Sequence, residues 1–302
     1  MSNHDTGVHI GIIGGTGLGE HLFGNDRALG TLSESSCPET PFGTPSGPIE
    51  TGTLADGTRL SLLARHGEGH VLNPHEVPYR ANVYALKMLG VTHVIASGAV
   101  GSLREQIQPG HVALVDQFID KTDGRPRTFY HEAAVHVEFA DPCCPVMRKW
   151  LSDAAQAAGI AVHETATYVC MEGPAFSTRA ESEMHRQWGG DLIGMTALPE
   201  ARLAREAELA YALVALPTDY DCWKQHDAPT GESLLQEIIA NLETATSACV
   251  ALIKQALSDT TSLQQEVSPA HRALDLAIWS DKSKIDPAEV QRLHALWGRC
   301  FE

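Results

Sequence analysis

Residues 8–19 have the sequence VHIGIIGGTGLG, a short apolar run that leads directly into a segment rich in glycine. β-Branched and apolar residues over 8–13 are typical of a buried strand. Glycines after a strand let backbone N–H groups converge on an anion, and Thr16 would add a hydroxyl group. A tight turn between a strand and a helix explains the glycines equally well. The stretch therefore predicts a strand followed by a loop, and it leaves a phosphate-binding role open.

Several common catalytic motifs are absent from the sequence. The dinucleotide pattern G-x-G-x-x-G would need a glycine where Glu20 stands, and no Gly-Lys-Ser/Thr occurs for a P-loop. A nicotinamide dehydrogenase is therefore disfavoured. His131 and His136 are five residues apart, whereas the H-E-x-x-H motif of zinc proteases needs four. No G-x-S-x-G is present, so the nucleophile elbow of the α/β-hydrolases is missing as well.

Further along the chain, short apolar runs alternate with helical patterns. Strands are expected at Val8–Ile13, Leu60–Ala64, Val91–Ala96, Val112–Val115, Tyr168–Met171, Leu192–Gly194 and Tyr211–Leu216. Helices are expected from Pro78 to Gly90, from Pro145 to Gly159, from Pro199 to Ala207 and from Glu232 to Leu257. This alternation predicts an α/β fold with a mostly parallel or mixed sheet covered on both faces. Ligands in such folds bind where strands end in loops.

The composition changes once along the chain, at the polar stretch 258–265, which has the sequence SDTTSLQQ and is typical of a linker. Beyond it, Asp286-Pro287-Ala288-Glu289 is typical of a helix start. Val290, Leu293, Leu296 and Trp297 follow on one helical stripe. We therefore predict one domain over residues 1–257, and a linker with a helical C-terminal extension over 258–302. The stripe must dock on the domain or on a neighbouring subunit.

Charge and cysteine usage limit the classes of partner. The 302 residues carry 22 Lys and Arg against 38 Asp and Glu, a formal net charge of −16 with neutral histidine. Such a field repels nucleic acid and anionic membranes, so neither is an expected partner. Seven scattered cysteines without a Cys-x-x-Cys pair argue against a disulfide framework or a zinc ribbon. With no basic and apolar leader, the sequence predicts a cytoplasmic protein.

Polar and small residues follow two further predicted strands. Arg65 and His66 come after the strand at 60–64, where a guanidinium fork and an imidazole could hold phosphate oxygens. An ion pair between Arg65 and a buried carboxylate is the alternative explanation. Residues 96–102, with the sequence ASGAVGS, are small enough for a ligand to approach the backbone, although close packing explains them equally well.

Two carboxylates follow the predicted strand at 211–216. Asp219 and Asp221 are two residues apart, beside Tyr220 and Trp223, and in extended backbone both would face the same way. Like charges held close together raise the pKa of one of the pair, which leaves a protonated carboxylic acid near neutral pH. Such a group can act as a general acid. The alternative is a solvated turn.

Six segments carry a family resemblance: Gly14-Gly15-Thr16-Gly17-Leu18, Ala64-Arg65-His66-Gly67, Gly101-Ser102-Leu103-Arg104, Met171-Glu172-Gly173-Pro174-Ala175-Phe176, Gly194-Met195-Thr196 with Pro199-Glu200, and Thr218-Asp219-Tyr220-Asp221-Cys222-Trp223. Together they resemble the trimeric purine nucleoside phosphorylases and, among these, the S-methyl-5′-thioadenosine phosphorylases. They follow in unbroken order over about residues 8–257, and the segment after about 258 lies outside the resemblance. The resemblance implies a single-domain α/β fold with a mixed central sheet flanked by helices.

The resemblance implies cleavage of an N-glycosidic bond by phosphate, giving adenine and 5-methylthioribose 1-phosphate in purine and methionine salvage. Inorganic phosphate would be the co-substrate, with no metal and no organic cofactor. The implied phosphate-binding residues are Thr16, Arg65, His66, Gly98, Ala99 and Thr196. The implied nucleoside-binding residues are Phe176, Ser177, Met195, Tyr220 and His136. The resemblance also implies that Asp219 donates a proton or hydrogen bond to N7 of the purine. Asp221 would accept a hydrogen bond from the 6-amino group, because a carboxylate is only an acceptor.

Two positions depart from the family pattern. Ser97-Gly98 stands where the family commonly has two threonines, which removes one phosphate hydroxyl. Glu232 aligns with an aliphatic position of the family's 5′ pocket, which leaves a 5′-hydroxyl or another 5′ substituent open. The alternatives are phosphorylases of adenosine, a 5′-haloadenosine or 5′-methylthioinosine and, from another class, a nucleoside-binding regulatory protein. The family pairs subunits across the active site, which implies a homotrimer or a dimer of trimers.

Overall fold

The computed structural model of the protein describes residues 7–14, 22, 30–224 and 231–302. Its strands are β1 (His9–Gly14), β2 (Gly30–Ser36), β3 (Ile49–Leu54), β4 (Arg59–Ala64), β5 (His93–Ser102), β6 (Val112–Leu114), β7 (Gln117–Lys121), β8 (Val162–His163), β9 (Thr167–Met171), β10 (Leu192–Gly194) and β11 (Ala210–Asp219). Its α-helices are α2 (Tyr79–Met88), α3 (Pro145–Ala157), α4 (Arg179–Gln187), α5 (Ala197–Glu206), α6 (Gly231–Leu257), α7 (Thr261–Gln265), α8 (Pro287–Arg292) and α9 (His294–Trp297). Its short 3-10 helices are η1 (Glu68–His70), η2 (Asp221–Trp223), η3 (Pro269–Arg272), η4 (Lys282–Lys284) and η5 (Gly298–Cys300).

The strands form one mixed sheet that branches at β5. The main path runs β2-β3-β4-β1-β5-β10-β9-β7, while β11 pairs with the other edge of β5 and leads to β6 and β8. The strands β4, β1, β5 and β11 are mutually parallel. Their carboxyl ends, which include Ala64 and Asp219, therefore meet at one edge of the sheet. This is the edge at which α/β folds bind their ligands.

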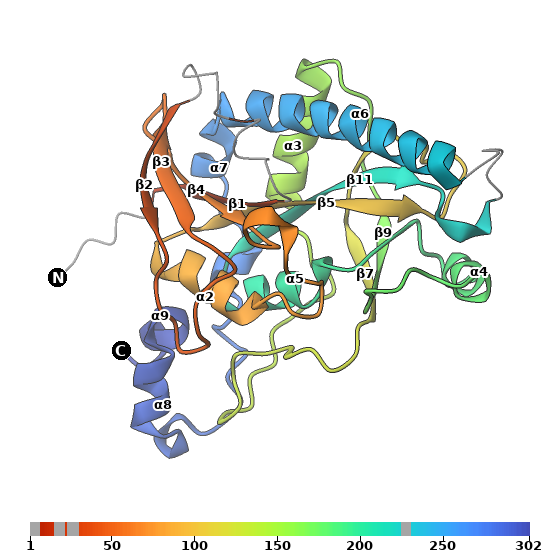
Figure 1. Cartoon of the computed structure of the whole chain (residues 1–302). Coiled ribbons are helices and arrows are strands. Elements are labelled where there is room, and N and C mark those ends of the chain that lie inside the picture. Colours follow the sequence, from red (N-terminus) through yellow and green to blue (C-terminus); the bar gives the residue numbers. More distant parts are fainter. Residues whose placement is uncertain (1–6, 15–21, 23–29, 225–230) are drawn as a thin grey trace.

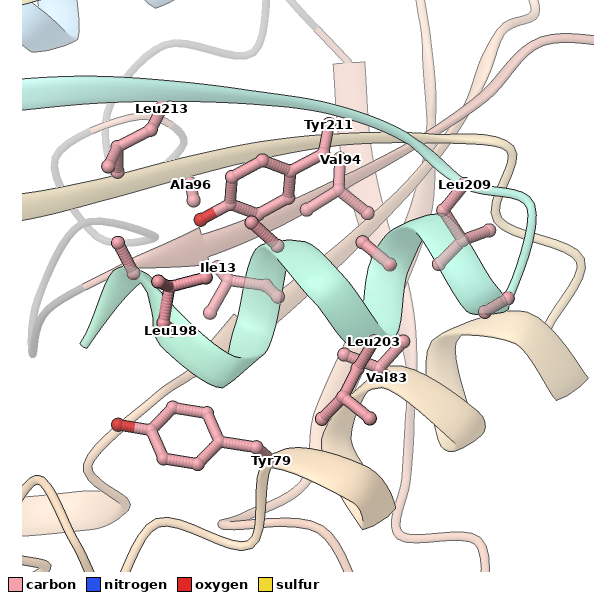
Figure 2. Close-up of a cluster of buried hydrophobic side chains, with 14 of the residues drawn as sticks. Ile13, Tyr79, Val83, Val94, Ala96, Leu198, Leu203, Leu209, Tyr211 and Leu213 are labelled. Carbon is pink, nitrogen blue, oxygen red and sulfur yellow. The ribbon is translucent and has the colours of Figure 1, made fainter. Parts of the chain in front are cut away.

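Helices cover both faces of the sheet. In Figure 1, α3 and α6 lie on one side, while α2 and α5 lie on the other. Figure 2 shows α5 between the sheet and α2, with Leu198 directed toward Ile13, and Leu203 toward Val83. These side chains are buried, as is Tyr211 of β11. The predicted layered α/β fold is confirmed, because the apolar stripe of each helix meets an apolar face of the sheet.

Strand β5 is longer than its sequence predicts. The expected strand ended at Ala96, with the small residues 97–102 placed in the loop after it. In the structure, β11 pairs in parallel with β5 as far as Gly101, and β10 pairs with Gly101 and Ser102. The small residues are therefore part of the strand, and their exposed side faces the open edge of the sheet.

Among the described strands and α-helices, six have no counterpart in the sequence prediction: β2, β3, β7, β8, α4 and α7. Helix α4 has no apolar stripe, because its only buried residues are Ser182 and His185. It is started instead by a capping box, in which Thr178 Oγ1 accepts from the Glu181 N–H and a Glu181 carboxylate oxygen accepts from the Thr178 N–H. The four strands are short or polar, so neighbouring strands rather than periodicity define them.

The segment after α6 packs closely against the domain. The stretch 258–265, predicted as a linker, contains helix α7 and buries Thr260 and Leu263. The buried Thr260 hydroxyl has hydrogen-bond partners in the domain, since it donates to Asp56 and lies 3.0 Å from the Thr58 hydroxyl. Further on, the expected cap is present, because Asp286 accepts from the Ala288 N–H. No helix among the described residues is long and apolar enough to span a bilayer.

Candidate active site

A cleft of about 1170 Å³ opens at the carboxyl ends of β4, β5 and β11. Its floor is the end of the branched sheet, and one side is formed by α6. The described residues that line it are Arg65, His66, His70, Pro74, residues 97–101, Met171, Phe176, residues 193–196, Leu216, Thr218, Asp219, Asp221, Ile238, Leu242, Glu243, Thr246, Ser247 and Val250. The cleft therefore brings together the ends of three motifs that are far apart in the sequence.

Arg65 lies at one end of this cleft and is 1% exposed. Its Nε and Nη2 donate to the two carboxylate oxygens of Glu200, at 2.8 and 3.0 Å. Its Nη1 donates to the Ser97 carbonyl at 2.8 Å, and the second Nη1 N–H has no hydrogen-bond acceptor among the residues that the structure describes. Burial lowers the pKa of Arg65, but the Glu200 carboxylate outweighs burial and holds the pKa above the usual range. The ion pair between Arg65 and a buried carboxylate, which was the alternative explanation, is present, and Arg65 also lines the cleft.

Beside it, His66 has one fixed tautomer. Its Nδ1 lies 2.8 Å from the Leu72 carbonyl, so Nδ1 carries the proton and donates it. Its ring stacks on His70 with the ring centres 4.2 Å apart. Burial lowers the pKa of His66, the Leu72 carbonyl opposes this, and the Arg65 and His70 charges lower it further. The lowered pKa favours the neutral imidazole, whose Nε2 lone pair can accept a hydrogen bond.

Gly98, Ala99 and Thr196 lie close to Arg65 in the same end of the cleft. A Cβ atom added at Gly98 would lie 3.7 Å from the Thr196 hydroxyl oxygen and 3.9 Å from Arg65 Nη1. The glycine thus opens the space between a hydroxyl and a guanidinium, where an anion could be bound. Thr16, predicted to join this group, lies outside the described residues.

Asp219 and Asp221 also line the cleft, beside Gly101, which lies three residues further along β5 than the Gly98 that neighbours Arg65. Their backbone is not extended as the sequence analysis assumed: Asp219 ends β11 and Asp221 begins η2 with φ +49°. The turn is closed by Asp219 itself, whose carboxylate accepts from the Asp221 N–H at 2.7 Å and from the Thr218 hydroxyl at 2.8 Å. Burial, with a smaller contribution from the Asp219 charge, raises the pKa of Asp221. Both residues line the cleft although the predicted local geometry is wrong.

Phe176 and Met195 form apolar walls near the two carboxylates. Phe176 is 83% exposed, so its ring lies at the mouth of the cleft. Gly173 has φ +71°, and a Cβ there would lie 2.5 Å from the Met195 sulfur, so only glycine lets this loop approach Met195. Ser177 is not among the described lining residues. Its hydroxyl faces the Met171 sulfur at 3.7 Å, and its carbonyl accepts from the Cys222 thiol.

Two predicted nucleoside contacts lie away from the cleft within this chain. The Tyr220 hydroxyl donates to the Glu105 carbonyl, and the Tyr220 ring lies under the Lys224 ammonium group at 4.0 Å. The His136 ring packs on Trp279 with the ring centres 4.7 Å apart, on an outer loop. Neither is among the described residues that line the cleft. Their contacts with a nucleoside stay predictions.

The sequence assigned no role to residues that bind the cleft-lining side chains without lining the cleft themselves. Glu200 pairs with Arg65 and also accepts from the Tyr211 hydroxyl at 2.8 Å. Glu200 was part of a recognised segment, but its partner Arg65 lies 135 residues away, and nothing in the sequence pairs them. Among the described residues, no three His, Cys, Asp or Glu side chains lie close enough together to hold a metal ion.

Comparison with known proteins gives consistent matches along the chain. The sequence profile of the phosphorylase superfamily matches residues 9–258. The S-methyl-5′-thioadenosine phosphorylase of Geobacter sulfurreducens is 47% identical over 292 residues, covering 96% of this chain and 98% of that protein. That of Chloroflexus aurantiacus is 47% identical over 295 residues, covering 96% and 97%. Because these relatives span nearly the whole chain, similarity extends into the segment after 258, which the sequence analysis had left outside the resemblance.

Solved structures agree with these relatives. A methylthioadenosine phosphorylase from an antarctic soil metagenomic library has a TM-score of 0.86 and 44% identity, covering 97% of this chain and 99% of that chain. The Schistosoma mansoni methylthioadenosine phosphorylase in complex with adenine has a TM-score of 0.75 and 33% identity, covering 96% and 98%. By these similarities in sequence and structure, the chain belongs to the phosphorylase superfamily and, within it, to the family of the S-methyl-5′-thioadenosine phosphorylases.

Proposed function

We propose that this protein is a pentosyltransferase that cleaves S-methyl-5′-thioadenosine with inorganic phosphate. The products are adenine and 5-methylthioribose 1-phosphate. A phosphate oxygen forms a bond to C1′ of the sugar as the bond between C1′ and N9 of the purine breaks, and the electron pair of that bond moves to the base. The transition state resembles an oxocarbenium ion, so catalysis rests on positioning two reactants and on stabilising the charges that develop.

The end of the cleft with Arg65 would hold the phosphate. The second Nη1 N–H of Arg65 and the Thr196 hydroxyl border the space at Gly98, and the Ala99 backbone lies alongside. Neutral His66 can accept a hydrogen bond from the P–OH of a hydrogen phosphate through Nε2, since its Nδ1 is engaged with Leu72. Thr16 is proposed to join them from its motif alone.

The opposite end would hold the purine. Asp219 would donate a proton or a hydrogen bond to N7, which favours departure of the base. Asp221 would accept a hydrogen bond from the 6-amino group of adenine. Phe176 would pack on the base and Met195 along the sugar, with Ser177 and Tyr220 next to this wall. Gly98 beside Arg65 and Gly101 beside Asp219 are three strand residues apart, roughly 10 Å, which would leave room for the ribosyl group between the two ends.

The observation that carries this proposal is the occurrence, in one cleft, of a buried arginine bordering an anion-sized space and of two carboxylates at the far end. A nucleoside-binding regulatory protein has no need for both. The test is adenine release from S-methyl-5′-thioadenosine with and without phosphate. Release that requires phosphate supports the proposal, whereas release without phosphate would indicate a hydrolase.

Adenosine is the second candidate substrate. The Schistosoma mansoni relative, at 33% identity, is described as an adenosine/methylthioadenosine phosphorylase. In this chain Glu232 is exposed near the start of α6, the helix that forms one side of the cleft. Comparing kcat/KM for adenosine, a 5′-haloadenosine, 5′-methylthioinosine and S-methyl-5′-thioadenosine ranks the 5′ substituents and the base. A higher value for adenosine would direct attention to Glu232.

We also infer a homotrimer or a dimer of trimers in the cytoplasm. Large apolar side chains are exposed around His136, namely Leu276 at 90% and Trp279 at 72%, and Phe176 stands open at the cleft mouth. Surfaces of this kind are typical of subunit contacts. The free cysteines described along the chain fit a reducing compartment. Light scattering would give a mass three or six times that of the chain.

A further inference from the structure

Arg125 is a buried arginine on the loop after β7, and it is not among the described residues that line the cleft. It is 6% exposed, and the protein itself binds its guanidinium group on every side. Its Nε donates to a Glu172 carboxylate oxygen at 2.8 Å, and its Nη2 donates to the Glu172 carbonyl at 2.6 Å. Glu172 begins the loop that carries Gly173 and Phe176. One side of Arg125 therefore anchors the proposed base-binding wall.

The other side of Arg125 anchors the turn between β10 and α5. Its Nη1 donates to the Met195 carbonyl at 2.7 Å and to the Leu198 carbonyl at 2.8 Å. These carbonyls flank Thr196, so the position of the Thr196 hydroxyl depends on where Arg125 holds the turn. Met195 is in the proposed sugar-binding wall, and Thr196 in the proposed phosphate-binding end.

Arg125 also contacts Tyr79, which links it to a third segment that lines the cleft. The Tyr79 hydroxyl accepts from Arg125 Nη1 at 3.2 Å and donates to the Pro74 carbonyl at 2.7 Å. Pro74 lines the cleft near His70. The guanidinium group also lies 5.6 Å from the centre of the Tyr79 ring. The two N–H groups of Nη1 thus serve three acceptors, of which the Tyr79 hydroxyl is the most distant. A planar guanidinium group presents its N–H donors in the fixed directions that these contacts need, whereas a lysine ammonium group does not.

We propose that Arg125 is a positioning residue for phosphorolysis: it sets the distance between the phosphate, sugar and base walls of the cleft without contacting any ligand. The proposal rests on the function proposed above. The reaction requires the phosphate oxygen and C1′ to be held within reacting distance, and a displacement of about 1 Å can cost about 10²-fold in rate. Since one guanidinium group fixes the Phe176 loop and the Thr196 turn together, its loss changes the spacing of both substrates.

The test compares Arg125→Lys and Arg125→Met with the wild-type enzyme. For Arg125→Lys we expect a fall in kcat/KM of about 10²-fold, with KM raised for both phosphate and nucleoside although Arg125 contacts neither. Arg125→Met should lose more, because lysine retains a cation near Glu172. Glu172→Gln weakens only the connection to the Phe176 loop, so it should raise the KM of the nucleoside and leave that of phosphate unchanged.

Arg205→Lys is the matched control. Arg205, on α5, is also 6% exposed. It donates to Glu138 and to the carbonyls of Asp141 and Pro142, which lie in the loop after β7 that also carries Arg125. None of these residues is among the described residues that line the cleft. Arg205→Lys should lower Tm and leave both KM values unchanged. The proposal is overturned if folded Arg125→Lys keeps wild-type KM values and kcat, or if Arg205→Lys changes the KM values as much.

Failure of the proposed function itself would be seen separately, in the wild-type protein. If the wild type releases no adenine in the presence of phosphate, the same variants are compared by calorimetric binding of adenine and of phosphate. Weaker binding of both ligands to Arg125→Lys, with unchanged binding to Arg205→Lys, still supports the positioning role. Unchanged binding of both ligands to Arg125→Lys overturns it.

Discussion

Arg65 combines the two roles that its sequence context suggested separately. Its bidentate pair with Glu200 is the structural role, and its second Nη1 N–H has the proposed functional one. The pair is buried on both sides, so loss of Glu200 would leave an uncompensated charge inside the protein, a change that typically costs about 3–5 kcal/mol. A substitution in the Arg65–Glu200 pair is therefore expected to lower both stability and activity. At other residues the two effects can be separated.

Asp219 is one residue where they can be separated, because it is partly exposed at the cleft. Asp219→Ala should lower kcat by about 10²–10⁴-fold, the range for loss of a general acid, and lower Tm only modestly, through loss of the two hydrogen bonds that close the turn. Phosphate-dependent adenine release and thermal unfolding measure the two effects. Asp219→Asn, which retains a donor of hydrogen bonds, should lose less. A kcat near wild type for Asp219→Ala would remove the leaving-group role.

Asp221 is expected to select the base. Asp221→Asn, combined with Asp219→Asn if needed, should shift preference toward 6-oxo purines, because an amide can donate to O6 whereas a carboxylate accepts from N6. The measurement is the ratio of hypoxanthine release from 5′-methylthioinosine to adenine release from S-methyl-5′-thioadenosine. If the ratio does not rise in either variant, the base is recognised by other residues.

Gly98 offers a gain-of-affinity prediction. Its missing Cβ would meet Thr196 and Arg65 only at ordinary contact distances of 3.7 and 3.9 Å, so a small side chain fits. Gly98→Ser would place a hydroxyl in the proposed phosphate site, and a hydrogen bond to a charged group contributes about 1.5 kcal/mol or more. We expect KM for phosphate to fall roughly tenfold. Gly98→Ala is the control without a hydroxyl and should show no such fall.

At the scale of elements, sequence periodicity predicted those that bury an apolar stripe. Strands β1, β4 and β11 and helices α2 and α3 lie close to where the pattern placed them, whereas β5 extends to Ser102, beyond its expected end. Helix α4 was missed because a capping box and polar contacts define it. The motif residues Arg65 and Asp219 were found because each follows a predicted strand, whereas Thr196 was implied only by the family resemblance. Their supports Glu200 and Arg125 were not, because those contacts join segments about 50–135 residues apart, which no local pattern reports.

The C-terminal helices provide a stability prediction at this scale. Trp297 is fully buried between Tyr130 and Phe301, with ring centres 4.8 and 5.2 Å away. Trp297→Ala should lower the free energy of unfolding by about 3–5 kcal/mol, measured by urea denaturation. A single cooperative transition would mean that residues 258–302 unfold with 1–257. A separate early transition would support the predicted extension as an independent unit.

At the scale of the whole molecule, buried histidines predict acid sensitivity. Burial, with Arg59 nearby, lowers the pKa of His9 to about 4. Burial, with His271 nearby, lowers the pKa of His93 to about 3. The unfolded chain binds protons below about pH 6.5, while the folded protein keeps both rings neutral. Stability is therefore fully present above pH 6.5 and declines as the pH falls toward 4.

The measurement is the urea midpoint between pH 7.5 and 4.5. His93→Gln, which keeps a polar side chain but cannot be protonated, should flatten the decline. An equally steep decline in that variant would exclude His93 as a cause. Since His93 sits at the start of β5, at the end of the strand away from the cleft, KM values at pH 7.5 should not change.

The pairing of Arg65 with Glu200 has a final consequence for turnover. In a molecule of net charge −16, the proposed anion site has an arginine whose charge is already balanced and a histidine whose pKa is lowered. An anion there is held by the direction of hydrogen bonds rather than by excess positive charge. Such a site exchanges its occupant easily, and each catalytic cycle must replace a sugar phosphate with a fresh phosphate. Weak retention of the product is then an advantage, because departure of the sugar phosphate need not limit the rate.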